Sequence, residues 1–294
     1  MHLPSCRIVS LLPSATEIVY ALGLEDQLVG VTDECDHPPA AQGKRVVVRS
    51  RQPAGLSAGE IDAWVRDRAA TGGLYVLDDA ALREIAPDLV LTQDLCRVCA
   101  VPTSEVGAAL ARVGCPSRLV TLEPQTLDDV LDSIVTVAEA ADVAGRGCAL
   151  RTALRERLDV VARAVAGWPR VPTLVLEWLD PPFTPGHWVP DVVVAAGGRA
   201  LLGSPGARSA ATDWSTVRAA RAEVVVLAPC GTEPPAIWAQ AHLVPADVMP
   251  RRTFAADLAR PGPRLVDAVE ALAAVLHPDA GLPLRPDVVL PRPA

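Results

Sequence analysis

The chain has 294 residues, of which 50% are hydrophobic and 21% are charged, and its formal net charge is −8 at pH 7. This length and composition allow one large core or two medium ones, which excludes an intrinsically disordered protein. The acidic balance and the lack of a Lys/Arg-rich block argue against nucleic acid or an anionic membrane surface as a partner.

The amino-terminal segment does not have the pattern of a secretory signal. Residues 1–7 lack a basic region, and the apolar run at 8–12 is broken by Pro13. No run of about 20 apolar residues occurs, so no transmembrane segment is predicted. We therefore expect a cytoplasmic protein, in which the seven Cys residues are free, catalytic or metal-ligating rather than disulfide-bonded.

Strand and helix patterns alternate along the first part of the chain. Buried strands are predicted at 7–12, 28–32, 46–48, 88–92 and 118–122. The first helix follows Ser14, which we expect to be its N-cap, with Glu17 completing a capping box. Further helices are predicted at 57–68, at 79–85 and around 106–113, whereas 72–77 is expected to be irregular. Ser57 and Glu60 form a second predicted capping box, at the start of the helix at 57–68.

Two consecutive helices are predicted in the middle of the chain. The first begins at N-cap Thr126, with Asp128 and Asp129 in its first turn, where the helix dipole favours acids. The second spans about 147–166. At ~1.5 Å per residue it is close to 30 Å long, which is enough to bridge two lobes.

The strand and helix alternation restarts after residue 168. Strands are predicted at 171–178, 200–202, 223–228 and near 248, helices at 190–196, 214–220, 237–241 and 264–276, and an irregular tail from 281. Strands that alternate with helices form mostly parallel sheets, which predicts an α/β fold of two Rossmann-like lobes joined by a long rigid helix. The predicted parts are an N-terminal α/β lobe (1–125), connecting helices (126–167) and a C-terminal α/β lobe (168–294).

Several blocks of sequence resemble one known family. Residues 10–17 (SLLPSATE), 22–24, 28–32 and 35–39 resemble the start of the periplasmic-binding-protein-like class that carries cobalamin, haem and iron-siderophores, and in particular its cobalamin-binding branch. Residues 85–91, 126–130 and 260–266 match the same family in the same order. The resemblance implies the class III fold, with cobalamin or a related corrinoid or metal chelate held between the lobes and an ABC transporter as candidate partner.

Some features depart from that family. The exported members need an export signal, which we do not see here, and the connection 49–80 looks longer than usual. The Cys-x-x-Cys motif of Cys96 and Cys99 is also not part of the family pattern. The resemblance therefore supports the fold more strongly than it supports uptake.

The resemblance places the ligand against the loop after the first strand, which here holds Pro13 and Ser14. A helix N-terminus presents N–H groups to a polar ligand edge, although Ser14 acting only as a cap is an equal alternative. Polar residues follow other strands at the same predicted edge and are expected to line the ligand: Asp36, Gln93, Asp94 and Glu177.

The loop after the strand at 171–178 is rich in Pro and aromatic residues. Trp178, His187 and Trp188 offer flat faces there, beside the carboxylate of Glu177. Such a loop suits a large planar ring with polar side groups. The alternative is that each Trp packs against its own lobe.

Four Cys residues lie at predicted strand ends, namely Cys35, Cys96, Cys99 and Cys230. Converging thiolates would suit Zn, Cu(I) or an iron–sulfur cluster, or would meet a cobalt or haem centre directly. A redox pair of Cys96 and Cys99 is a third interpretation. The fourth is that these are small, buried Cys residues without a chemical role.

No nucleophile elbow, Walker loop or Gly-x-Gly-x-x-Gly motif is present, so the common hydrolase and nucleotide-binding classes fail. The leading prediction is a cytoplasmic ligand-binding protein, not an enzyme, that holds cobalamin or a related metal chelate in the interlobe cleft. The alternative is a metal or iron–sulfur protein, catalytic or redox-active, that uses the Cys cluster in the same cleft.

Overall fold

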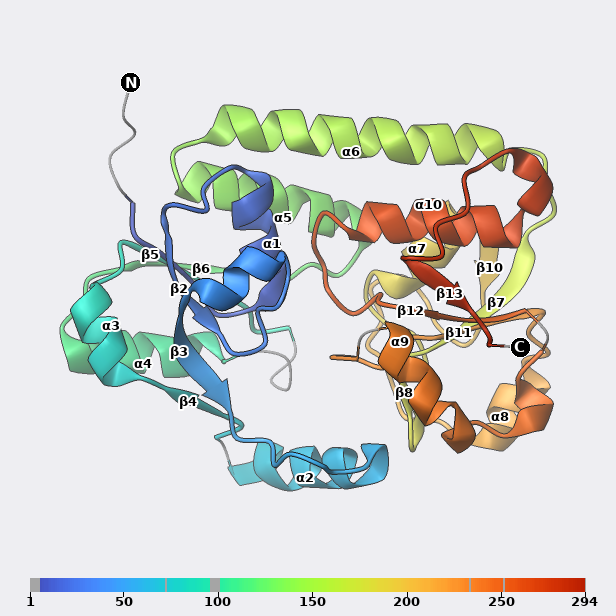
Figure 1. Cartoon of the computed structure of the whole chain (residues 1–294), viewed down its shortest axis with the longest axis horizontal. Coiled ribbons are helices and arrows are strands. Elements are labelled where there is room, and N and C mark those ends of the chain that lie inside the picture. Colours follow the sequence, from blue (N-terminus) through green and yellow to red (C-terminus); the bar gives the residue numbers. More distant parts are fainter. Residues whose placement is uncertain (1–5, 72, 96–100, 233, 251, 294) are drawn as a thin grey trace. The chain divides into compact units, whose positions relative to one another are not determined.

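The computed structural model describes residues 6–71, 73–95, 101–232, 234–250 and 252–293 (Figure 1). The chain forms two compact units. Unit 1 is Met1–Glu123 with Leu131–Arg151, and unit 2 is Pro124–Val130 with Thr152–Ala294. The chain passes from one unit to the other three times: after residue 123, inside helix α5 (Leu127–Ala140) and inside helix α6 (Ala144–Ala164). The predicted boundaries at 125 and 167 stay predictions.

Unit 1 is built on a six-stranded sheet with the order β4-β3-β2-β1-β5-β6. Its strands are β1 (Ile8–Ser10), β2 (Leu28–Thr32), β3 (Arg45–Ser50), β4 (Tyr75–Leu77), β5 (Leu89–Thr92) and β6 (Arg118–Thr121). All neighbours are parallel except β3 and β4, which are antiparallel. The strand order reverses at β1, which lies between β2 and β5, and open α/β sheets bind ligands beside such a switch point.

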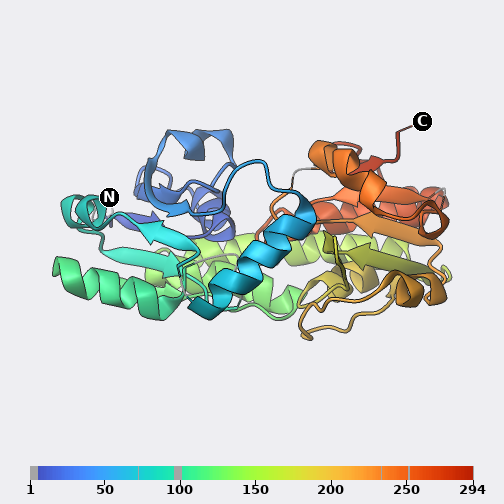
Figure 2. The ribbon, with the colours of Figure 1, turned by 90° about the horizontal axis from the view of Figure 1, so that it is seen from below.

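Helices cover the sheet of unit 1, so its central strands are apolar on both faces. Besides parts of α5 and α6, the unit holds α1 (Pro13–Ala21), the 3₁₀ turn η1 (Pro39–Gly43), α2 (Ala58–Thr71), α3 (Asp79–Ile85) and α4 (Thr103–Val113). Val9 and Val90 of the central strands share a buried core with Leu82 of α3 and Leu110 of α4. Figures 1 and 2 both show α2 outside the sheet, joined to it through the segment that follows β3.

The two capping boxes predicted in unit 1 have different outcomes: the one at the start of α2 is confirmed, and the N-cap predicted for α1 is wrong. Ser57 and Glu60 form the predicted capping box of α2, since Glu60 Oε2 accepts from the Ser57 N–H at 2.8 Å. The prediction of Ser14 as N-cap is wrong, because α1 begins at Pro13 and Leu12 occupies the N-cap without a side-chain bond. Proline is favoured at this first helical position, since its φ is already helical and its missing N–H would be unpaired anyway.

Unit 2 is built on a five-stranded sheet with the order β10-β7-β11-β12-β13. Its strands are β7 (Val171–Leu176), β10 (Gly198–Ala200), β11 (Val224–Leu227), β12 (Thr253–Ala256) and β13 (Val289–Pro291). Only β13 runs antiparallel to its neighbour. A separate two-stranded hairpin, β8 (Trp178–Leu179) with β9 (Pro182–Phe183), follows β7 directly.

Helices pack on the sheet of unit 2 through residues that alternate along its strands. The helical elements are α7 (Val189–Ala195), α8 (Trp214–Ala219), α9 (Pro234–Ile237), η2 (Trp238–Leu243), η3 (Ala246–Val248), α10 (Leu265–Leu276) and η4 (Pro278–Ala280). Leu174 and Leu176 of β7 share a core cluster with Val217 of α8 and Ile237 of α9. Val175, between them, points to the other face of the sheet and is equally buried.

Three predictions in unit 2 are wrong in detail. The predicted strand near Val248 is a 3₁₀ turn, and the strand lies further on, in β12. The tail expected to be irregular contains β13, whose Leu290 is in register with Ala255 of β12. The strand predicted to reach Trp178 ends at Leu176, because the chain turns there into the β8–β9 hairpin. In unit 1, the segment 72–77 likewise contains an edge strand, β4.

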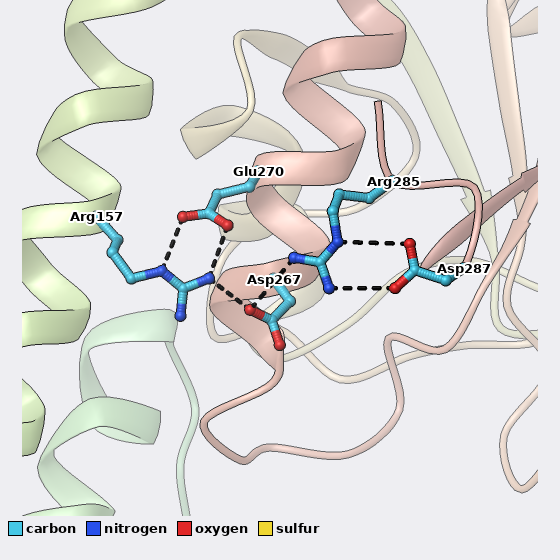
Figure 3. A network of polar contacts seen from close by, with 5 residues as sticks. All are labelled: Arg157, Asp267, Glu270, Arg285 and Asp287. Atoms are coloured by element: carbon cyan, nitrogen blue, oxygen red, sulfur yellow. Dashed lines mark hydrogen bonds and ion pairs between the residues drawn. The ribbon is translucent and has the colours of Figure 1, made fainter. Parts of the chain in front are cut away.

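A network of charged side chains joins three parts of unit 2 (Figure 3). It links Arg157 of α6 to Asp267 and Glu270 of α10, and from there to Arg285 and Asp287 of the C-terminal segment. Within the described ranges, no helix combines the length and the apolarity needed to cross a bilayer.

Candidate functional site

Strands β1 and β5 end side by side at the switch point of unit 1. The Leu11 N–H donates to Leu91 O at 2.9 Å just beyond the paired strands, which brings the following residues to one edge. Pro13 and Ser14 begin α1 there, and Gln93 follows β5 with 6% of its side chain exposed. Pro13 has no N–H, so the unpaired backbone donors in the first turn of α1 are those of Ser14 and Ala15, which are 3% and 0% exposed.

Asp94 holds the start of helix α4. Its Oδ1 accepts from the Thr103 N–H at 2.7 Å. This contact takes the place of a side-chain cap, since the N-cap residue, Pro102, makes no side-chain bond. Thr92, at the end of β5, contacts the residues before α4 as well, since its hydroxyl donates to Val101 O at 2.8 Å. Asp94 is therefore a positioning residue for the loop after β5.

Cys96 and Cys99 are outside the described residues, so the metal and redox interpretations of their motif stay untested predictions. Helix α4 begins at Thr103, after both cysteines.

Cys35 belongs to a buried cluster of hydroxyl groups. Its side chain is 3% exposed, the Thr16 hydroxyl donates to its Sγ at 3.1 Å, and Thr32 Oγ1 lies 3.3 Å from the same sulfur. Burial raises the pKa of the Cys35 thiol and outweighs the hydrogen bonds from Thr16 and Thr32, which lower it. Among the described residues, Cys35 belongs to no group of three or more His, Cys, Asp or Glu side chains placed to hold a metal ion. Asp36 follows it in the same loop and is half-buried.

The corresponding edge of unit 2 is formed by the ends of β7 and β11. Glu177 follows β7 and Cys230 follows β11, and the Cys230 N–H donates to Glu177 O at 3.1 Å. Glu177 Oε1 accepts from the Gly186 N–H at 2.8 Å, which closes the base of the hairpin loop. Gly186 is required there, because an added Cβ would lie 2.1 Å from the backbone nitrogen of Ser209.

His187 is held in a strained backbone conformation beside that base. Its φ is +50°, and its N–H donates to Ala207 O at 2.6 Å. Burial lowers the pKa of His187, and the charge of Arg208 lowers it further, so the imidazole is neutral at pH 7. Nδ1 lies 3.2 Å from Gln125 Oε1. An amide oxygen only accepts, so this pairing puts the ring proton on Nδ1 and the lone pair on Nε2.

The two predicted tryptophans differ in their surroundings. Trp188 is 7% exposed, stacks on His187 with ring centroids 5.9 Å apart, and donates from Nε1 to Leu258 O at 2.8 Å. These contacts support the alternative that Trp188 packs within its own unit. Trp178 is half-buried, and its Nε1 donates to Asp180 O at 3.0 Å.

The predicted metal site finds no support in the described part of the chain. No group of three or more His, Cys, Asp or Glu side chains there is placed to hold a metal ion. Cys35 is buried among hydroxyl groups of unit 1, whereas Cys230 is exposed and belongs to unit 2. The zinc and iron–sulfur alternatives therefore lack a ligand set among these residues.

Sequence reasoning missed several residues that shape the two edges. Gln125, which orients His187, directly precedes the capping box of Thr126 and carries no signal of its own. Thr16 and Thr32 were predicted only as parts of a helix and a strand. Their contact with Cys35 depends on how β1, α1 and β2 pack, which spacing along the chain does not report.

Comparison with known proteins identifies the family. The model of the family described as periplasmic binding protein matches residues 8–256. A vitamin B12-binding protein of Vibrio cholerae serotype O1 is 58% identical over 38 residues, and one of Vibrio vulnificus is 51% identical over 39 residues. Each match spans 13% of this chain and only 14% of the relative's length.

Solved structures show the same fold over nearly the whole chain. A periplasmic heme binding protein from Pseudomonas aeruginosa is 22% identical, covers 98% of both chains and has a TM-score of 0.74. The periplasmic vitamin B12 binding protein BtuF of Vibrio cholerae is 23% identical, covers 92% of this chain and 96% of its own, and has a TM-score of 0.65. The predicted class III fold of two α/β lobes with mostly parallel sheets is confirmed.

The predicted cytoplasmic location is wrong. It rested on the first dozen residues, whereas the family match extends over 8–256 and names periplasmic proteins, as do the similar solved structures. The expectation that the cysteines are free or ligating depended on a cytoplasmic location, so this argument for it no longer holds. The chain belongs to the periplasmic binding protein family.

Proposed function

We propose that this protein binds a corrinoid, cobalamin in the first place, and delivers it to an ABC transporter. The observation that carries the choice of ligand is the 38-residue stretch that is 58% identical to a vitamin B12-binding protein. The SLLPSATE block at 10–17, where α1 begins beside the end of β5, supports the same branch of the family.

The edge of unit 1 supports recognition of the polar groups around a macrocycle. The first-turn N–H groups of α1 have no partners within the helix, and they carry the positive end of its dipole. Amide or carboxylate groups on the rim of a corrin or porphyrin are suitable acceptors for them. Gln93, which follows β5 at the same edge, adds an amide.

The edge of unit 2 supports recognition of the ring and its metal. The neutral imidazole of His187 presents Nε2 as a lone-pair donor, which cobalt and iron accept. The half-buried indole of Trp178 is a flat apolar surface of the kind on which a planar ring stacks. That the ligand lies between the lobes stays a prediction of the family resemblance.

Haem is the second candidate, because the structure with a TM-score of 0.74 is a heme binding protein. Titration of the full chain with cyanocobalamin and with haem, followed by tryptophan fluorescence and calorimetry, separates the two. We expect saturable binding of one cobalamin per chain and weaker binding of haem. Tighter binding of haem would reassign the ligand, and failure to bind either would overturn the proposal.

A histidine variant tests the role of the second edge. His187→Ala should weaken cobalamin binding about tenfold or more, because it removes Nε2, the nitrogen that we propose as a ligand of the corrinoid metal. His242→Ala is the matched control, since His242 is exposed in the same unit and bonds only to Ala239 O nearby. Equal binding by the two variants would exclude His187 from the site.

A further inference from the structure

The imidazole ring of His187 has one nitrogen that is bonded and one that is free. Nδ1 pairs with Gln125 Oε1 at 3.2 Å, whereas Nε2 has no partner in the described part of the chain. Nε2 is not a buried atom either, although the side chain as a whole is half-buried. The exposed part of the ring therefore includes Nε2, and a ligand can reach this nitrogen.

The backbone and one neighbouring ring fix where that nitrogen lies. The His187 N–H donates to Ala207 O at 2.6 Å, and His187 O accepts from the Gly206 N–H at 3.0 Å. The imidazole stacks on Trp188, whose own Nε1 donates to Leu258 O at 2.8 Å. His187 is thus held at both backbone groups and at one face of its ring, so little side-chain freedom is left to lose when Nε2 binds.

Gln125 is held in place on the other side of the contact. Its N–H donates to Asp129 Oδ2 at 3.0 Å, and the Leu127 N–H donates to Asp191 Oδ2 at 3.1 Å. These bonds fix the start of α5 and attach it to α7, all within unit 2. The Gln125 amide therefore reaches the His187 ring from a backbone that two carboxylates hold.

We infer that Gln125 is a positioning residue through which the site selects metal chelates with an exchangeable axial ligand, an inference that rests on the proposed function. Because Gln125 Oε1 accepts the Nδ1 proton, Nε2 of His187 has a lone pair and no proton. In aquacobalamin the cobalt–water bond breaks and a cobalt–Nε2 bond forms, with both electrons from nitrogen. Water leaves, and neither oxidation nor proton transfer is needed. In cyanocobalamin the tightly bound cyanide blocks the same position.

Absorbance titration of the full chain with aquacobalamin and with cyanocobalamin tests the inference. We expect aquacobalamin to bind at least about tenfold more tightly, with a change in its visible spectrum as nitrogen replaces water. Gln125→Leu should reduce this preference about tenfold, because Nδ1 loses its acceptor. Gln125→Glu should keep the preference, because a carboxylate accepts the same proton.

Gln240→Leu is the matched control. Gln240 is a half-buried glutamine in η2 of the same unit and does not bond to His187, so this variant should show the preference of the wild type. His187→Ala should abolish the preference and the spectral change, since its loss of affinity concerns aquacobalamin. Thermal unfolding of each variant checks that it is folded.

Three results would overturn the inference but leave the proposed function in place. They are equal binding of the two cobalamins by the wild type, a preference that survives Gln125→Leu, and an equal loss of both cobalamins in Gln125→Leu, which would show a structural role only. Binding of neither cobalamin by the wild type would overturn the inference and the proposed function together.

Discussion

Arg157 of α6 and Glu270 of α10 form a two-bond ion pair, with Arg157 Nε 2.8 Å from Oε1 and Nη2 2.7 Å from Oε2 (Figure 3). Arg157 also contacts Asp267, which Arg285 approaches from the C-terminal segment at 3.9 Å. The hydrogen bonds that Arg157 donates to Glu270 are the main reason why the pKa of Arg157 lies far above its usual value. This pair therefore fixes how the second half of α6 packs on α10 within unit 2.

Arg157→Gln should lower the free energy of unfolding by about 2 kcal/mol, because two half-buried carboxylates lose their shared partner. Urea unfolding measures the change. Arg163→Gln on the same helix is the control, since Arg163 is exposed and outside the network, and it should change stability by less than about 0.5 kcal/mol. Equal losses in the two variants would show that the network adds nothing beyond helix propensity.

The stability of the protein should depend on pH through His187. Its pKa in the folded state is lowered from 6.5, so on acidification the unfolded chain takes up this proton first. The destabilisation is absent above pH 6.5, grows as the pH falls below it, and levels off below the folded-state pKa. His187→Asn should flatten this part of the stability curve, measured by urea unfolding between pH 7 and 5.

The lowering of that pKa has two causes, which can be separated. Arg208→Gln removes the nearby positive charge and should raise the pKa of His187, although burial keeps it below 6.5. NMR titration of the ring protons measures the shift. No shift in this variant would leave burial as the only cause.

The thiols should differ strongly in reactivity. Cys148 and Cys230 are exposed and should react quickly with a thiol reagent in the folded protein, whereas Cys35 is buried with a raised pKa and should react only on unfolding. Cys230→Ser should remove one fast-reacting thiol, and Cys35→Ser should remove none. Rapid labelling of Cys35 in the native protein would contradict the buried hydroxyl cluster.

Two glycine substitutions should have opposite effects. Gly186→Ala places a Cβ 2.1 Å from Ser209 N, so the loop must move and the hydrogen bond to Glu177 is lost, at a cost of about 3 kcal/mol. Gly107→Ala lies inside α4 with nothing within 4 Å, and should stabilise the protein by about 0.5–1 kcal/mol. Thermal unfolding of both variants tests the contrast.

Elements with strong local signals could be predicted from the sequence. Helix α3 and strand β2 have the predicted bounds, and both the capping box of Ser57 and the N-cap Thr126 are present. The edge strands β4 and β13 could not be predicted, because their formation depends on pairing with β3 and β12 rather than on their own pattern.

For the candidate site, the sequence predicts which residues follow the ends of the strands, but not what each of them contacts. Parallel strands bring their carboxyl ends to one edge, and Ser14 and Gln93 follow the neighbouring strands β1 and β5, as Glu177 and Cys230 follow β7 and β11. That these residues contact a ligand stays a prediction. Their individual roles were not predictable. Glu177 and Asp94 each bind a backbone N–H nine residues further along the chain, a relation that depends on the loop conformation.

A binding protein needs a stable fold and a surface that can change with its ligand. The hydrogen bond that Glu177 accepts from the Gly186 N–H serves the first of these needs. This side-chain contact joins the end of β7 to the start of α7, and the β8–β9 hairpin lies between the two. Leu179 of that hairpin belongs to the core of unit 2, whereas Trp178 and Asp180 beside it reach the surface and are open to replacement. Members of this lineage that carry different cargoes should have diverged first at these surface positions, and a library randomised there is the natural starting point for changing what the protein carries.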